Sequence, residues 1–404
     1  MNAKPRLVAA EPYRLFFPLA LLTGILGVLL WPLFYWQQIS FYPLFAHSRM
    51  MIEGFVGGFA IGFLATAMPK MLSTPPFRLW QVLALATLYI GSCTSHFVGS
   101  VKVGDGLFAA TLILLLGCLA IRVKNATSTP PPSMILAAMG LFCGLFGSVW
   151  SAFFVPSEHF YLTLFSQRLL FQAFILLPIL GVGGFFFPMV FETQKTSEKG
   201  KHVWRNKALY SGALGLLIIL TYWVEVHGQA RAMSASRFIL CLIWLSLECG
   251  WLRKSPAKGV ITIGLRAGIA CVLLGIAATS IFQQQRVALE HTLYIGGFCL
   301  ITMMVAARVI FGHSGQANQF HKWGRLLTVC VLLVLLTMAT RISADFLPGL
   351  RVSHHIYAAF CWVIVSIIWG LALLPSIRKQ PVPKPIASTP PKARSVLDMD
   401  FRKK

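Results

Sequence analysis

The chain has 404 residues, of which 57% are hydrophobic and 12% are charged. Soluble domains carry about 25% charged residues, so this composition excludes an ordinary water-exposed surface and indicates a protein whose solvent is the lipid bilayer. The formal net charge of +23 does not indicate a nucleic-acid partner, because the basic residues lie between apolar segments and near the C-terminus.

Apolar segments follow one another along the chain, and each is long enough to cross a bilayer as an α-helix. The first segment is not followed by a small-residue cleavage motif, so we interpret it as a retained helix rather than a signal peptide. The predicted fold is an all-α polytopic membrane bundle of about 12 transmembrane helices. We expect these helices near residues 14–36, 46–69, 78–97, 104–122, 133–154, 159–190, 205–224, 235–252, 263–282, 288–311, 323–343 and 353–374.

Lysines and arginines are distributed unequally between the two sets of predicted loops. If the N-terminus is cytoplasmic, the outer loops carry only Lys102, Arg231, Arg237, Arg286, Arg341 and Arg351. The inner loops then carry many more, among them Lys70, Arg78, Arg122, Lys124, Lys201, Arg205, Arg253, Lys254, Lys258, Arg266 and Arg325. Because cytoplasmic loops are enriched in Lys and Arg, we predict that the N- and C-termini are both cytoplasmic.

The chain divides into a helical part and a tail. We expect residues 1–377 to form a single transmembrane bundle. Residues 378–404 are rich in Pro, Lys and Arg and cannot bury a core, so we expect a disordered basic cytoplasmic tail. The nine cysteines form no CxxC pair and fall inside apolar segments, which indicates small buried side chains rather than disulfides or zinc ligands.

Several histidines stand at the ends of predicted helices on the outer side. His47, His159, His291, His354 and His355 each open a helix under the predicted topology. Neutral imidazole is a common ligand of haem iron and copper, so we expect a cofactor site to which His47, His291, His354 and His355 contribute, with His47, His291 and His354 as the metal ligands. For any one of these histidines, the alternative is an interfacial side chain that hydrogen-bonds water or a helix end.

The second predicted helix carries the densest set of candidates. His47 and Met51 are four residues apart and share a helix face, so the pair could ligate copper or haem; ordinary packing of Met51 is the alternative. Gly54, Gly58 and Gly62 are also spaced four apart. Small residues in this pattern let a neighbouring helix approach the backbone closely, so we expect helix packing along this stripe.

Two charged residues lie deep inside predicted helices. At 1.5 Å per residue, Glu53 is about 10 Å and Arg168 about 13 Å from the start of its helix. Unpaired charges at such depth are costly, so we expect both to face the interior, as an ion pair with each other or as part of a cofactor site. Arg49 and Arg168 are candidate partners of anionic groups such as haem propionates, and a purely structural ion pair explains them equally well.

Three stretches resemble the NnrS family of bacterial membrane proteins. The first is the opening "YRLFFPLALLTGILGVLLW", and the second runs from His47 through "EGFVGGFAIGFLATAMPKM". The third is His291 followed by "TLYIGGFCLITMMVAARVIFGHSGQ". The hydropathy profile agrees over nearly the whole chain.

The resemblance implies a haem- and copper-containing protein of the bacterial inner membrane that acts in the response to nitric oxide stress. It implies a respiratory electron donor or a nitric oxide-derived species as the partner. The matched positions are His47, Met51, His291 and His313. By the predicted topology, His313 lies on the cytoplasmic side, about 33 Å along the helix from His291, so the two cannot share one metal ion.

The second stretch departs from the family pattern. Where the family has a second His and a Glu, this chain has Arg49 and Met50. One ligand expected from the family is therefore missing, which puts retention of copper or haem in doubt. His354 and His355 could supply a replacement, an inference that rests on their position alone.

Two other functions fit the composition. One is a secondary transporter without a redox cofactor, in which Glu53 and Arg168 line a path; the absence of a clear internal repeat in the sequence counts against it. The other is a structural or assembly factor for a respiratory complex. The sequence has no phosphate-binding loop, nucleophile elbow or HExxH motif, so no catalytic motif identifies an enzyme.

Overall fold

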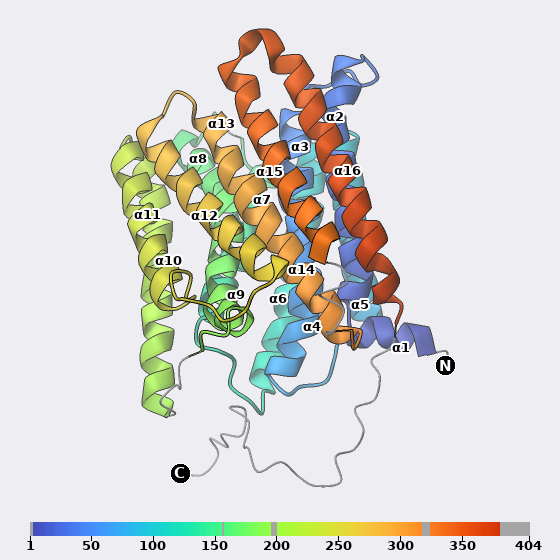
Figure 1. Cartoon of the computed structure of the whole chain (residues 1–404), viewed down its shortest axis with the longest axis vertical. Helices are drawn as coiled ribbons and strands as arrows, with labels where there is room; N and C mark the ends of the chain where they lie inside the picture. Colours follow the sequence, from blue (N-terminus) through green and yellow to red (C-terminus); the bar gives the residue numbers. More distant parts are fainter. Residues whose placement is uncertain (1–2, 156, 195–199, 317–323, 380–404) are drawn as a thin grey trace.

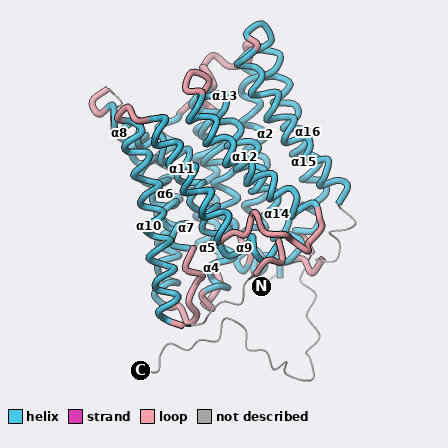
Figure 2. Tube along the Cα trace, turned by 60° about the vertical axis from the view of Figure 1, so that its left-hand side comes forward, coloured by secondary structure: helices cyan, strands magenta, loops and turns pink. Residues whose placement is uncertain are grey.

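The computed structural model describes residues 3–155, 157–194, 200–316 and 324–379, and the regular structure in these ranges is entirely helical (Figures 1 and 2). Eleven helices in these ranges are long and apolar enough to cross a membrane. The predicted class, a polytopic helical membrane protein, is confirmed. Most of the predicted tail, from residue 380 onward, lies outside the described residues.

The helices follow the chain in the predicted order. The first half contains α1 (Ala3–Ala10), α2 (Tyr13–Tyr35), α3 (Leu44–Arg49), η1 (Met50–Val56), α4 (Gly57–Met71), α5 (Leu79–Phe97), α6 (Val101–Lys124), α7 (Met134–Phe153), α8 (Phe160–Arg168), η2 (Leu169–Ala173) and α9 (Phe174–Val190). The second half contains α10 (Lys201–Val226), α11 (Ala230–Leu247), α12 (Val260–Ile281), α13 (Arg286–His291), η3 (Thr292–Cys299), α14 (Leu300–His313), α15 (Gly324–Phe346), η5 (Pro348–Leu350) and α16 (Arg351–Ile377).

Helix α5 corresponds to the third predicted helix, residues 78–97, and is the one predicted crossing that is not among the eleven apolar spans. Its 19 residues reach about 28 Å at 1.5 Å per residue, and it packs along α6. Its lower hydropathy comes from polar residues such as Gln81, Ser92 and His96, and all three are buried inside the bundle. The structure therefore contains all twelve predicted helices, one of them with a polar interior face.

One predicted boundary is wrong by several residues. The expected helix 235–252 is α11, Ala230–Leu247. We predicted Arg237 in an outer loop, but it lies inside α11 with 1% of its surface exposed and is paired with Glu225 of α10. Because this ion pair compensates the arginine's charge, Arg237 can lie inside the helix, whereas hydropathy alone places the start of the helix several residues too late.

The predicted glycine stripe packs against α2. A Cβ atom at Gly58 would lie 2.8 Å from Cβ of Ala20, and one at Gly62 would lie 2.8 Å from Cβ of Phe16. At Gly54, the first position of the stripe, an added Cβ would overlap Thr23 of α2. The expected helix packing is confirmed, and the close approach fixes the position of the helix that carries His47.

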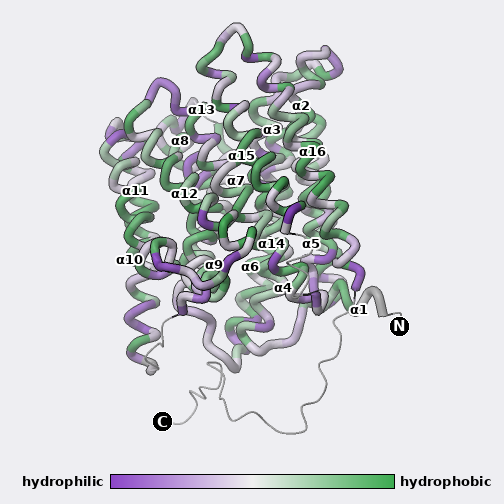
Figure 3. The backbone as a smooth tube through the Cα atoms, viewed as in Figure 1, coloured by the Kyte–Doolittle hydropathy of each residue, from purple (hydrophilic) through white to green (hydrophobic). Residues whose placement is uncertain are grey.

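The N-terminal helices and the end of α16 lie at the same end of the bundle, drawn at the bottom of Figure 1. The Arg14 guanidinium donates hydrogen bonds to the carbonyl oxygens of Ile377 and, at 3.0 Å, Lys379. We call this the lower end and the opposite one, where α3 and α16 begin, the upper end. Between the two ends the helices are largely apolar (Figure 3). That the lower end faces the cytoplasm stays a prediction from the distribution of charge.

Candidate functional site

Three long helices change to π-helical geometry a few residues below the upper end, at η1, η2 and η3. Each change directly follows a candidate residue: Arg49 ends α3, Arg168 ends α8 and His291 ends α13. A π-helical turn accommodates an extra residue and redirects the side chains around it, and such turns are frequent at functional sites. Irregular backbone therefore accompanies the candidate residues on three separate helices.

Three histidines approach one another at the upper end. His47 comes from α3, His291 from the end of α13 and His355 from the first turns of α16. The rings of His47 and His355 both contact the Trp31 ring, at 6.0 and 5.1 Å, and the His291 ring contacts Tyr294 at 6.0 Å. The structure thus brings together residues from three helices that are far apart in the sequence.

In each of these histidines, Nδ1 is engaged in a hydrogen bond. The partners are the Gly27 carbonyl for His47 at 2.9 Å, the Val287 carbonyl for His291 at 2.7 Å and the Tyr35 hydroxyl for His355 at 2.7 Å. A carbonyl oxygen only accepts, so Nδ1 of His47 and of His291 carries the proton and Nε2 carries the lone pair. Nε2 of His355 is buried and has no hydrogen-bond partner among the described residues.

The Nδ1 hydrogen bonds are those of metal-ligating histidines, but among the described residues these three are not a group whose ligand atoms all lie within 4.8 Å of one another. A metal-ligating histidine typically holds its second ring nitrogen in a hydrogen bond, which fixes the tautomer and the ring orientation. Met51 lies nearby, because its Sδ atom would be 3.4 Å from a Cβ atom on Gly27, the residue whose carbonyl His47 contacts. Imidazole and thioether are ligands of copper and haem iron, so the donor set matches the cofactors that the sequence resemblance implies.

Aromatic side chains surround the three imidazoles. The Trp31 ring lies 6.0 Å from that of His47 and 5.1 Å from that of His355. The Tyr294 ring lies 6.0 Å from His291. We did not predict Trp31 or the Tyr35 hydroxyl as part of this site; they stand four residues apart at the end of α2, a spacing that places them on one face.

The adjacent histidines of α16 have different surroundings. His354 hydrogen-bonds the Ser343 hydroxyl of α15 at 2.9 Å, and its ring lies 6.3 Å from Tyr357. The His355 ring instead contacts the rings of Trp31 and Tyr35 on α2, at 5.1 and 6.0 Å. Of the two replacement ligands that the sequence offered, the structure directs His355 toward His47.

Glu53 belongs to a separate polar cluster deeper in the bundle. His96 of α5 places Nε2 2.9 Å from Oε2 of Glu53. Arg49, the residue that replaces the second histidine of the family pattern, donates from Nε to Oδ1 of Asp105 at 3.1 Å. The predicted ion pair between Glu53 and Arg168 is wrong, because each residue pairs with closer partners on its own side of the bundle.

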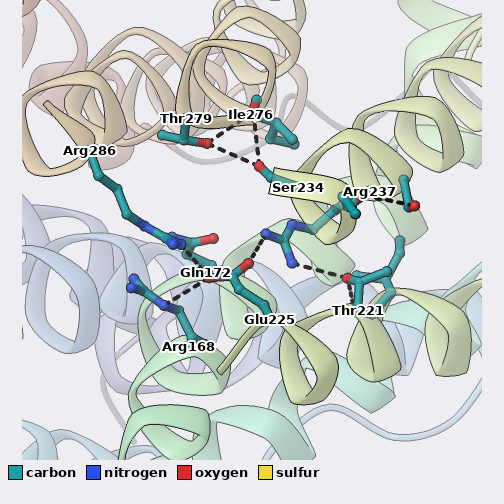
Figure 4. Close-up of polar contacts among 12 residues, drawn as sticks. Arg168, Gln172, Thr221, Glu225, Ser234, Arg237, Ile276, Thr279 and Arg286 are labelled. Atoms are coloured by element: carbon teal, nitrogen blue, oxygen red, sulfur yellow. Dashed lines mark hydrogen bonds and ion pairs between the residues drawn. The ribbon is translucent and has the colours of Figure 1, made fainter. Parts of the chain in front are cut away.

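Arg168 joins a network of three arginines and two glutamates between α8, α10, α11 and α13 (Figure 4). It contacts Glu225 at 3.2 Å and Glu290 at 3.0 Å. Glu225 also pairs with Arg237 and Arg286. The positive charges of Arg168 and Arg49 are thus compensated by carboxylates of the protein. Both arginines are therefore less available to pair with a haem propionate than the sequence indicated.

His313 lies at the lower end, far from His291. Its Nδ1 atom is 2.7 Å from Oε1 of Glu11 and 3.0 Å from Nζ of Lys70. Burial raises the pKa of the Glu11 carboxyl, but the hydrogen bond and charge of His313, together with Arg14, outweigh burial and lower this pKa to about 2. His313 therefore takes part in a polar contact that ties α14 to the start of α2.

These features define a class: a polytopic α-helical membrane protein with imidazoles from several helices gathered near one end of the bundle. The family model described as NnrS protein matches residues 7–380. The chain belongs to the NnrS family, as the three sequence stretches predicted. A comparison with curated proteins gives no match.

Proposed function

We propose that this NnrS family protein binds copper or haem at His47, His291 and His355 and acts in the bacterial response to nitric oxide stress, in the inner membrane. One observation carries the proposal. Three imidazoles from distant helices lie at the upper end with Nδ1 in a hydrogen bond, and in His47 and His291 the carbonyl partner leaves Nε2 free to ligate.

The donor set favours copper at these residues. Three imidazoles and the Met51 thioether are soft or intermediate ligands, which suit copper better than hard cations. A haem iron would take one or two of the same imidazoles as axial ligands. Either cofactor would supply one-electron chemistry when bound, with a respiratory chain component as the electron donor.

The protein's own residues orient the ligands. The Gly27 carbonyl and the Tyr35 hydroxyl hold the rings of His47 and His355, and Trp31 packs against both rings. Such outer contacts typically change metal affinity about 10- to 100-fold when removed. Tyr35 and Trp31 are therefore positioning residues for the proposed site.

The transporter alternative loses its main support. Glu53 and Arg168 belong to two separate networks rather than to one path. A cavity of about 90 Å³ between α2, α4, α9 and α14 is lined almost entirely by apolar side chains such as Phe59, Phe174 and Ile301. A polar substrate would find no charged group there.

The proposal is tested by a visible spectrum and metal analysis of the full-length protein purified in detergent. We expect copper or iron in the wild type and its loss in His47→Ala, His291→Ala and His355→Ala. His354→Ala is the matched control, because this neighbour is bonded to Ser343 and should leave the cofactor in place. Folded, metal-free wild-type protein, or equal loss in His354→Ala, would refute the assignment.

The physiological part is tested in cells. A strain that lacks the gene should grow more slowly under a nitric oxide donor. The wild-type gene should restore growth, and the His291→Ala variant, produced at the same level, should not. Equal growth of all strains under the donor would count against a role in nitric oxide stress while leaving the metal site open to the spectroscopic test.

A further inference from the structure

A second group of ligand atoms lies inside the bundle, apart from the three histidines. Glu53 of η1, His96 of α5 and Asp105 of α6 each place one ligand atom within 4.8 Å of the other two. Their exposed fractions are 1%, 0% and 1%. Three helices therefore direct a carboxylate, an imidazole and a second carboxylate to a common point that water does not reach.

The charges of this cluster are not balanced by the described residues. The carboxyl groups of Glu53 and Asp105 each place an oxygen atom within 4.8 Å of the other. Arg49 compensates one negative charge through contacts of 3.1 and 3.4 Å with Asp105. Oε1 of Glu53 is buried and has no hydrogen-bond partner in the described part of the chain. With a neutral His96, Arg49 leaves one of the two buried carboxylates uncompensated, so a bound cation, or a proton on a carboxyl group or on His96, must balance the charge.

We propose that Glu53, His96 and Asp105 bind one divalent metal ion, Zn²⁺. Nε2 of His96 lies 2.9 Å from Oε2 of Glu53 and 3.8 Å from Oδ1 of Asp105. In a tetrahedral zinc site with bonds of about 2.0 Å, ligand atoms are about 3.3 Å apart, a value between these two distances. The Oε1 atom of Glu53, which has no hydrogen-bond partner among the described residues, would let this carboxylate bind the ion through both oxygens.

The chemistry of the donors separates this site from the proposed redox site. Two carboxylates and one imidazole suit Zn²⁺, whereas thioether or thiolate ligands, which select copper in its reduced state, are not among these three residues. The site is closed to water, which is typical of a structural metal. The ion would hold η1, α5 and α6 together directly below the helix turn that carries His47.

Gly104 offers a test that leaves all three ligands in place. An added Cβ atom at Gly104 would lie 2.7 Å from Nε2 of His96 and closer still to Cε1 and Nδ1, so Gly104→Ala must displace the imidazole. Gly106 is on the same helix, and its added Cβ would meet only Cβ of Ala152 at 3.8 Å, an ordinary contact. Gly106→Ala is therefore the matched control.

The experiment uses full-length protein in detergent, treated with a chelator, incubated with Zn²⁺ and washed before elemental analysis. We expect about one zinc ion per chain in the wild type and in Gly106→Ala. Glu53→Gln and Gly104→Ala should bind zinc at least about tenfold more weakly. Loading with Co²⁺ gives a second readout, since its visible ligand-field bands should appear in the wild type and disappear in Glu53→Gln.

The redox proposal and the zinc proposal fail separately. His47→Ala should lose the redox cofactor and keep the zinc, and Glu53→Gln should do the reverse. Wild-type protein that takes up no zinc, or Glu53→Gln protein that retains it, would overturn the zinc site. An infrared band of a protonated carboxylic acid in the wild type that is absent from Glu53→Gln would assign the compensating charge to a shared proton and likewise overturn it.

Discussion

Replacing Glu225 with glutamine should destabilise the protein strongly. Glu225 is 4% exposed and contacts Arg168 at 3.2 Å, with Arg237 and Arg286 closer still (Figure 4). Its carboxylate is thus shared by three guanidinium groups, and after the substitution Glu290 would be the remaining carboxylate of this network. Breaking a buried ion pair by removing one partner costs about 3–5 kcal/mol.

This cost is a large fraction of the free energy of unfolding, which is about 5–15 kcal/mol for folded proteins. At roughly 2 °C per kcal/mol for a chain of this size, the midpoint of thermal unfolding should fall by about 6–10 °C. The measurement is thermal unfolding in detergent, followed by circular dichroism. Glu158→Gln is the control, because Glu158 is exposed and should change the midpoint by less than about 1 °C.

A double variant tests the electrostatic reasoning itself. Arg286→Gln removes one of the guanidinium groups that surround Glu225. In the Glu225→Gln/Arg286→Gln protein, fewer uncompensated positive charges remain buried, so the loss of stability should be smaller than the sum of the two single losses. Additive losses, or a Glu225→Gln midpoint within about 2 °C of the wild type, would refute the argument.

Two further predictions concern packing and pH. Gly58→Ala should lower the free energy of unfolding by about 1–3 kcal/mol, because the added Cβ would lie 2.6 Å from the Tyr89 hydroxyl. Gly117 has open space around it, so Gly117→Ala should be neutral or stabilising. The midpoints of thermal unfolding in detergent compare the two variants. Since His313 and Arg14 lower the pKa of Glu11 from 4.5 to about 2 despite its burial, ionised Glu11 stabilises the fold fully above about pH 4.5. This contribution, about 2 kcal/mol after solvent screening, should disappear as the pH falls toward 2. Thermal unfolding measured between pH 6 and 3 should therefore depend less on pH in Glu11→Gln than in the wild type. Equal pH dependence of the two proteins would contradict the assignment.

The helices could be predicted because a membrane leaves the backbone few choices. A segment of bilayer length must satisfy its hydrogen bonds internally, so hydropathy alone located the twelve helices, with α5 and α11 as the informative exceptions. In both, polar side chains such as His96 and Arg237 are buried against partners from other helices. Local hydropathy carries no information on such partners, so it underestimates these helices or misplaces their ends.

For the candidate site, the sequence indicated which residue types stand at helix ends and which share a face, as for His47 and Met51. It did not determine that His355 rather than His354 turns toward His47, or that Glu53 meets His96 while Arg168 meets Glu225. The helical repeat sets the direction of a side chain relative to its own axis. The rotation and depth of one helix against another are set by packing, through contacts such as the glycine stripe against α2, and by the π-helical turns. Only the tertiary structure therefore decided which of the buried charges and imidazoles meet.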